Sequence, residues 1–294
     1  MPQLHRAMAT MALMLFALSA QAQSYLRPLQ NVRRVVVTFR YDVANGQRQA
    51  SSCVVHQRIS DSLGRAHTLL NWDCASKQVS SHVWHTFSGQ RVVATHTFSD
   101  GQLRLWQTFA YAAADTLPCS ERIVRVNPGD TALYVSITYS QRGNTRQAQA
   151  KGPKGQRAWS AKHTYDAHGV ELTRRVKVKR GFSPLDSIAE LRRTPTYDSL
   201  GRMCAEAIAI KRTDGRQIYQ RFAYTHNARG QLAERRALDA QGRTLYYETM
   251  EYSGGGALKT ISRYDAQGVL IDYHFKRYEL YPTANRQQRI IEHL

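Results

Sequence analysis

Apolar and polar residues alternate along most of the chain with a period of two residues. In residues 216–224, for example, Ile218, Phe222 and Tyr224 fall on one side of an extended strand, with Arg221 on the other. A period of two places alternate side chains on opposite faces of a β-strand. One apolar and one polar face is typical of strands in an antiparallel sheet. The best helical candidate is the short segment Pro184–Arg193, which begins with proline and acidic residues and ends in two arginines.

Short turn motifs separate these alternating segments. Tyr165-Asp166-Ala167-His168-Gly169 recurs at 197–201 and 264–268, with weaker copies at 227–230 and 239–242. Aspartate or asparagine can accept hydrogen bonds from the backbone of its own turn, and glycine tolerates a left-handed backbone. Glycines 215, 230, 242, 256 and 268 lie 12 to 15 residues apart. That spacing leaves about 8–10 residues for each strand between hairpin tips.

The pattern therefore predicts an all-β fold, a long antiparallel meander of consecutive hairpins in a twisted, curved sheet. The apolar face needs cover, so the sheet either closes partly on itself or folds into two layers. We expect a divergent meander at 23–140 and regular hairpin repeats at 158–294. Between them, residues 141–157 carry five positive charges and no acid, which predicts a basic loop or linker. The two halves are also compatible with one continuous sheet.

The sequence Tyr-Asp-x-x-Gly-Arg at Tyr197 to Arg202, and nearly so at Tyr165 to Val170, resembles the YD (RHS) repeat. That family includes the shells of bacterial polymorphic toxins, the ectodomains of teneurins and many short secreted bacterial proteins. The resemblance covers residues 164–273. It implies contact with carbohydrate or protein, and it adds one alternative: a small relative of toxin-delivery modules that holds a partner chain.

Residues 1–22 have the pattern of a cleaved signal peptide. A weakly basic start precedes the apolar run Met11–Leu18, and Ala20-Gln21-Ala22 is a small-x-small cleavage site. This predicts a secreted or periplasmic protein. No other apolar run is long enough for a transmembrane helix. A transmembrane barrel is disfavoured because Ala233–Ala237 places charges on both faces of a strand, which a lipid-facing band does not tolerate.

The chain is strongly basic, with a net charge of +19, and removal of residues 1–22 leaves +18. Such a field favours acidic partners, here an acidic polysaccharide or another envelope protein. The candidate polyanion-binding residues are Arg175, Lys177 and Lys179, which alternate with valines and would stand roughly 6.6 Å apart on one strand face. Arg192, Arg193 and Arg212 are candidates to widen this row. The alternative is a merely solvated face. Nucleic acid is disfavoured because no aromatic residues interleave with these cations.

Four cysteines in an exported chain permit disulfides. Cys53 and Cys74 flank the turn at 61–64, but a simple register places Cys53 opposite Asp73. Their pairing therefore needs a bulge, and the alternative is a pair of buried free thiols. No Cys-x-x-Cys motif is present. His82 and His85 are three residues apart and so face opposite ways on a strand, which argues against a shared metal.

No motif for nucleophilic or metal-assisted hydrolysis occurs in the sequence, and no cofactor is expected. Asp186, Glu190 and Glu206 are candidates for dispersed catalytic carboxylates of an envelope hydrolase, which is the weaker alternative. The sequence favours an exported, non-catalytic β-repeat protein that binds or acts as a scaffold.

Overall fold

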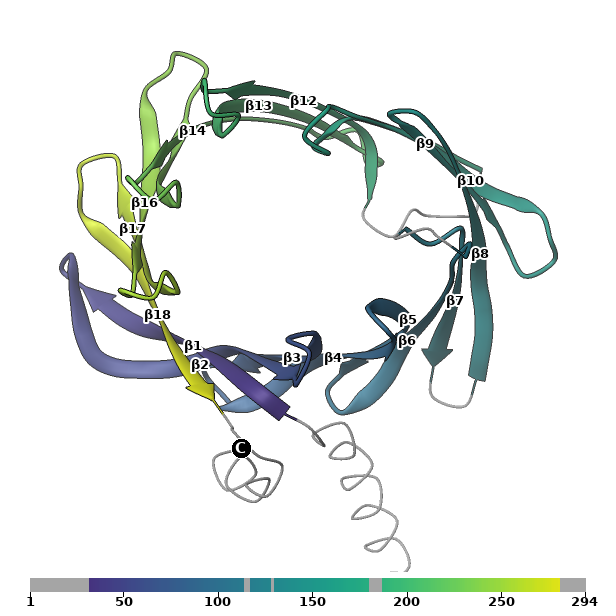
Figure 1. The fold of residues 1–294 in the computed structure, drawn as a ribbon, viewed down its shortest axis with the longest axis horizontal. Coiled ribbons are helices and arrows are strands. Elements are labelled where there is room, and N and C mark those ends of the chain that lie inside the picture. The colour runs from purple at the N-terminus through teal and green to yellow at the C-terminus, as the bar shows by residue number, and fades with distance from the viewer. Residues whose placement is uncertain (1–31, 114–116, 128–129, 180–186, 281–294) are drawn as a thin grey trace, which may run out of the picture.

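The computed structural model describes residues 32–113, 117–127, 130–179 and 187–280. Over these ranges the chain forms eighteen β-strands in one sheet, and each strand pairs antiparallel with the next. The last strand also pairs with the first, so the sheet closes into a barrel (Figure 1). The strands are β1 (Val32–Ala44), β2 (Gln47–Asp61), β3 (Ala66–Asp73), β4 (Gln78–Ser88), β5 (Arg91–Ser99), β6 (Gln102–Ala110), β7 (Ser120–Asn127), β8 (Asp130–Arg142), β9 (Thr145–Lys151), β10 (Arg157–Tyr165), β11 (Glu171–Val178), β12 (Ile188–Tyr197), β13 (Met203–Arg212), β14 (Gln217–His226), β15 (Leu232–Leu238), β16 (Thr244–Tyr252), β17 (Leu258–Asp265) and β18 (Leu270–Leu280).

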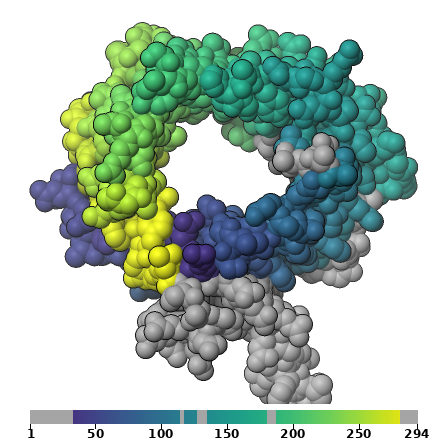
Figure 2. Space-filling model, viewed as in Figure 1, coloured from purple at the N-terminus to yellow at the C-terminus, as the bar shows by residue number. Residues whose placement is uncertain are grey.

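The barrel surrounds an open lumen, which Figure 2 shows as a hole through the ring. A barrel of this many strands is too wide for its own side chains to fill. The predicted all-β meander of consecutive hairpins is confirmed, and the sheet closes completely. Within the described ranges, no helical segment has the length and hydropathy needed to cross a membrane. The expected signal peptide, residues 1–22, and the candidate acid Asp186 lie outside the described residues.

The predicted helix at Pro184–Arg193 is wrong where it can be compared. Ile188 to Arg193 belongs to β12, Ser187 precedes the strand, and residues 184–186 lie outside the described ranges. Leu191 is buried while its neighbour Arg192 is exposed, which is the alternation of a strand.

The loop expected at 141–157 is also wrong at its centre, because Thr145–Lys151 forms β9. Ala148 and Ala150 are buried, and the residues that alternate with them, Gln147, Gln149 and Lys151, are exposed. Alanine contributes little to a hydrophobic pattern, so the period of two was easily missed. Only the short turns on either side of β9 are irregular.

The repeated Asp-x-x-Gly motif forms hairpin tips, as predicted. In the copy at Asp198, the N–H of Gly201 donates to the Asp198 carbonyl at 3.0 Å, and Gly201 has a φ of +73°. The Asp198 carboxylate accepts the backbone N–H groups of Leu200 and Arg202, both at 2.9 Å. The Arg202 guanidinium then pairs with the same carboxylate at 2.7 Å. The arginine after the glycine therefore closes its own turn.

The tyrosine of the motif connects one hairpin to another. The Tyr197 hydroxyl donates to the carboxylate of Asp166, the aspartate of the previous copy. Its ring stacks on His168, with centroids 4.1 Å apart. Burial and the hydrogen bond to Asp166 raise the pKa of Tyr197 to about 12. The tyrosine thus joins the β10–β11 turn to the β12–β13 hairpin at the same rim.

Other turns at this rim are joined in the same way. These turns follow even-numbered strands, and because neighbouring strands run in opposite directions they all lie at one end of the barrel. The Arg65 guanidinium donates to the carbonyl of Gly89. Arg91 reaches the Ala113 carbonyl at 3.0 Å, and Arg229 reaches that of Gly254 at 2.9 Å. This end of the barrel is therefore a rim of turns linked to their neighbours.

The hydrophobic clusters lie on opposite faces of the single sheet. Residues that pair directly share a face, so the register can be followed around the barrel. The largest cluster, around Ile123, Val135 and Ile137, occupies what we call the first face. The strand pairs can be followed from β7 back to β1. They show that the cluster of Val35 and Ile59 lies on the opposite face, which we call the second face.

Candidate functional site

Of the predicted row of cations, Arg175 and Lys177 lie on the second face of β11, and Lys179 follows directly after the end of the strand. Arg175, Lys177 and Lys179 are exposed, and the intervening valines, Val176 and Val178, pack against the first-face cluster. The side chain of Arg175 is 69% exposed, and its Nε lies 3.5 Å from Oε1 of Glu190. We call these three residues the cation ladder. Its valines hold the strand in place, and its charged heads point into solvent.

Neighbouring strands widen the ladder, but not as expected. Lys162 on β10 pairs directly with Arg175, shares its face and is exposed. Sequence reasoning missed Lys162 because its place depends on the strand register. Arg192 shares the ladder face, where it pairs with Glu190 at 2.9 Å. Arg193 and Arg212 lie on the first face, so the expectation that they widen the ladder is wrong.

The first face carries a row of charged residues along β12–β18 and β1, which we call the ion-pair belt. Arg193 Nε lies 3.1 Å from the Glu206 carboxylate, which also accepts the Tyr224 hydroxyl. Glu248 pairs with Arg235 at 2.7 Å and with Arg263 at 2.6 Å. At the closing seam, Arg40 pairs with Asp272 at 3.1 Å. In strand order the belt consists of Arg193, Glu206, Tyr224, Arg235, Glu248, Arg263, Asp272 and Arg40.

A second polar group lies on the first face beside the apolar cluster. Glu171 on β11 accepts hydrogen bonds from His163 at 2.5 Å and Arg174 at 2.8 Å. Burial alone would raise the pKa of Glu171, but the hydrogen bonds and charges of His163 and Arg174 outweigh it and lower this pKa to about 2. Glu171 is therefore ionised at any physiological pH.

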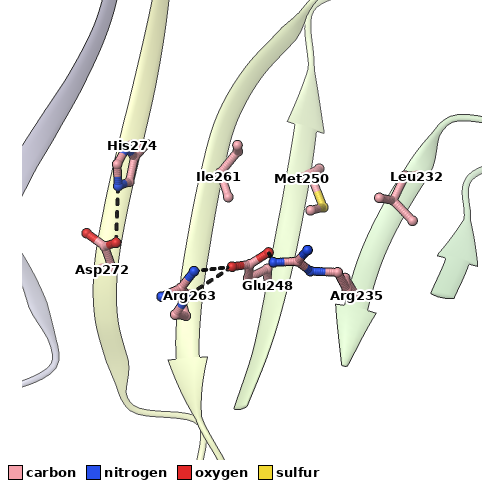
Figure 3. Close-up of a pocket in the computed structure, with 8 residues that line it drawn as sticks. All are labelled: Leu232, Arg235, Glu248, Met250, Ile261, Arg263, Asp272 and His274. Carbon is pink, nitrogen blue, oxygen red and sulfur yellow. Dashed lines mark hydrogen bonds and ion pairs between the residues drawn. The ribbon is translucent and has the colours of Figure 1, made fainter. Parts of the chain in front are cut away.

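A hollow of about 380 Å³ opens along the belt between β15 and β18 (Figure 3). One part of its lining is ionic, with Glu248 held between Arg235 and Arg263. Another part is apolar and is formed by Leu232, Met250 and Ile261. Asp272 and His274, 3.1 Å apart, complete the lining. Because its carboxylates are already paired, the hollow offers no free acid–base pair.

Cys53 and Cys74 form a disulfide, with Cα atoms 5.5 Å apart. A bulge between Ile59 and Ser60 shifts the β2–β3 register by one residue, so that His56 pairs with Asn71. Extending that register places Cys53 opposite residue 74 instead of Asp73. The bulge supplies the shift that a simple hairpin lacks. Cys119 and Cys204 are free thiols.

The histidines considered for metal binding have other contacts. His82 stacks on Phe98, with centroids 4.1 Å apart, and His85 lies 3.0 Å from the Thr95 hydroxyl on the opposite face. Burial lowers the pKa of both imidazoles. Within the described ranges, no three His, Cys, Asp or Glu side chains lie close enough to hold a metal ion.

The candidate carboxylates for hydrolysis are engaged in ion pairs. Glu190 is held by Arg192 and Arg175, and Glu206 by Arg193. Hydrogen bonding by Arg192 lowers the pKa of Glu190. A glycosidase needs one carboxyl whose pKa is raised so that it can donate a proton. Among the described residues, the carboxyl groups whose pKa departs from its ordinary value are all lowered: Asp61, Asp73, Asp166, Glu171, Glu190, Asp198 and Asp239.

No protein-family model matches this chain, and no curated protein does either. Similar solved structures include a porin-like protein from Bacteroides uniformis, 9% identical over 85% of this chain and 98% of that one, with a TM-score of 0.39. A porin-like protein from Bacteroides vulgatus is 9% identical over 86% and 100%, with a TM-score of 0.32. TcdB2-TccC3 is 14% identical over 80% of this chain and 15% of that chain, with a TM-score of 0.24. At these TM-scores the likenesses carry no argument about function.

Proposed function

We propose that the protein is an exported, non-catalytic barrel that binds an acidic polysaccharide of the cell envelope along the cation ladder. The observation that carries this proposal is the exposed row of Arg175 and Lys177 on one face of β11, continued by exposed Lys179 just beyond the strand. Alternate residues of a strand stand roughly 6.6 Å apart, so the row presents evenly spaced charges to a repeating polyanion. Lys162 adds a second column on β10.

The ladder differs from the other charged surfaces in how its charges are balanced. Arg192 is engaged by Glu190, and Arg236 on β15 by Glu234. Among the described residues, Lys177 and Lys179 have no carboxylate within ion-pair distance. Arg175 lies 3.5 Å from Glu190, but a polyanion that binds at Lys177 and Lys179 gains attraction without having to displace a described carboxylate. Interactions with such an exposed surface weaken as salt is added.

Two further features support a non-catalytic protein outside the bilayer. The clustered carboxylates of the first face are held by arginines, which removes the proton donor that hydrolysis requires. The second face carries ion pairs such as Glu234 with Arg236. A lipid-facing wall does not tolerate such pairs. Export itself rests on the sequence pattern of residues 1–22.

The test is a binding titration of the purified protein with polygalacturonate, an acidic polysaccharide, and with dextran, a neutral one. We expect binding to polygalacturonate at low salt, its loss at high salt, and no binding to dextran. The double variant Lys177→Gln/Lys179→Gln should weaken binding roughly three- to tenfold, the effect of two exposed charge contacts.

Lys259→Gln is the matched control, because Lys259 is an exposed lysine on β17, remote from β11 in the strand order. It should leave the affinity unchanged. Binding that is equally strong with dextran, or that weakens as much in the control as in the double variant, would refute the ladder as the site. Failure to bind any polysaccharide, with capture of an envelope protein instead, would replace the proposed partner.

A further inference from the structure

Three cations gather on the first face at the seam where β18 meets β1. They are Arg34 on β1, Arg58 on β2 and Lys276 on β18, and we call them the seam cluster. The register places them on one face: Lys276 pairs with Thr38, Val36 with Arg58, and Arg34 with Ser60. Within the described part of the chain, none of the three has a carboxylate partner. The nearest acid of that face on β18, Asp272, is already held by Arg40 and His274.

The cluster surrounds short side chains. Val36 and Thr38 lie on β1 between Lys276 on one neighbouring strand and Arg58 on the other. Long cationic side chains therefore flank a shallow floor. Burial and, next, the charge of Arg58 lower the pKa of Lys276. Like charges have thus been brought together without an internal anion to balance them.

Two polar groups at the seam cluster, one from Arg34 and one from its neighbour Ser60, lack partners within the described ranges. Arg34 Nε and Ser60 Oγ are buried and make no hydrogen bond there, and Ser60 is 0% exposed. These two residues pair directly across β1 and β2. Buried polar groups are normally hydrogen-bonded, so two neighbouring donors without acceptors require an explanation.

We propose that the seam cluster binds a phosphate or sulfate group. Such a group brings acceptor oxygens and negative charge. The two guanidinium groups, the lysine ammonium and the serine hydroxyl of this site need both. The fork of an arginine matches two oxygens of a tetrahedral oxyanion, and lysine adds a point charge. The site is independent of the proposed polysaccharide site, because it lies on the opposite face of the wall from the ladder.

The test is calorimetric titration of the purified protein with inorganic phosphate, inorganic sulfate, glucose 6-phosphate and glucose. We expect binding of the oxyanions and none of glucose. Tighter binding of glucose 6-phosphate than of inorganic phosphate would show that the group is recognised as part of a larger molecule, and the reverse would show that the free ion is the ligand. Arg58→Gln should weaken binding about tenfold or more, because it removes a charged hydrogen-bond donor.

Arg34 is partly buried, so the affinity of Arg34→Gln is interpreted only if its circular dichroism spectrum is that of the wild type. Lys276→Gln serves as the second variant. Lys154→Gln, at an exposed lysine in the β9–β10 turn outside both proposed sites, is the matched control and should leave oxyanion affinity unchanged. Phosphate should also raise the melting temperature of the wild type more than that of Arg58→Gln. An absence of heat and of thermal shift with every oxyanion, or equal affinity in Arg58→Gln, would overturn the proposal. A failure to bind polysaccharide would not contradict the oxyanion proposal, because the two sites are separate.

Discussion

Two arcs of the same face of this barrel are built on different chemistry. Along β7–β11 the first face carries the largest apolar cluster beside the polar group of Glu171, and Ile123, Val135 and Ile137 are at most 2% exposed. Along β12–β18 it is crossed by the ion-pair belt and, within the described residues, carries the smaller cluster of Ile208, Phe222 and Ala237. The backbone arrangement is the same in both arcs, so the difference lies in the side chains alone.

The two arcs contribute differently to the stability of the fold. Burying apolar side chains stabilises a fold by about 25 cal/mol for each Å² removed from water. Ion pairs contribute much less, because desolvation of the charges offsets most of their attraction. The apolar arc therefore holds the wall together, and the charged arc carries polar groups that are paired with one another.

The largest effect should come from the apolar arc. Ile123→Ala removes a fully buried side chain and leaves a cavity, so we expect a loss of about 3–5 kcal/mol in the free energy of unfolding. Ile210→Ala is the matched change in the charged arc, where the isoleucine is only half-buried, and should cost about 1–2 kcal/mol. Urea denaturation measures both. Equal losses would break the distinction between the arcs.

An intermediate effect should come from the belt. Glu248→Gln leaves Arg235 and Arg263 without their shared carboxylate, and we expect a loss of about 2–3 kcal/mol. Glu234→Gln removes a carboxylate of the second face that pairs with the exposed Arg236, and should cost less than about 1 kcal/mol. Thermal unfolding at fixed pH compares the two. If the belt contributes nothing to stability, the two variants should unfold at the same temperature.

The smallest effect concerns Glu171, at the border between the arcs. Its pKa is about 2 in the folded protein, below the ordinary value of 4.5. A lowered folded pKa stabilises the protein above pH 4.5, and this stabilisation is lost as the pH falls from 4.5 towards 2. We expect Glu171→Gln to be less stable than the wild type by about 2 kcal/mol at pH 7, and the difference to shrink over that window. A difference that is constant with pH would exclude this carboxylate as the cause.

Local features of the fold could be predicted from the sequence. The turn at Asp198–Gly201 needs only an acceptor side chain and a residue that tolerates a left-handed backbone, and both are readable within four residues. The strands likewise follow from alternation, because burial on one face imposes a period of two. The exception at β9 arises from alanines, whose small apolar surface gives a weak pattern.

Features that depend on distant pairing could not be predicted. Arg40 and Asp272 are 232 residues apart in sequence, and they meet only because β1 pairs with β18. The bulge between Ile59 and Ser60 that brings Cys53 beside Cys74 leaves no composition signal either. The belt and the seam cluster are assembled by this register, so sequence reasoning found the exposed ladder and missed both.

Closure of the sheet limits how any partner can attach. Every described strand has a neighbour on both sides, so no described strand is an edge strand along its whole length. Short segments such as Lys276–Leu280 of β18 pair on one side only, with β1. An incoming peptide therefore has no complete edge to extend as an additional strand, which is a common way for β proteins to capture chains. Recognition is restricted to side chains on the two surfaces of the wall and to the loops at its two mouths.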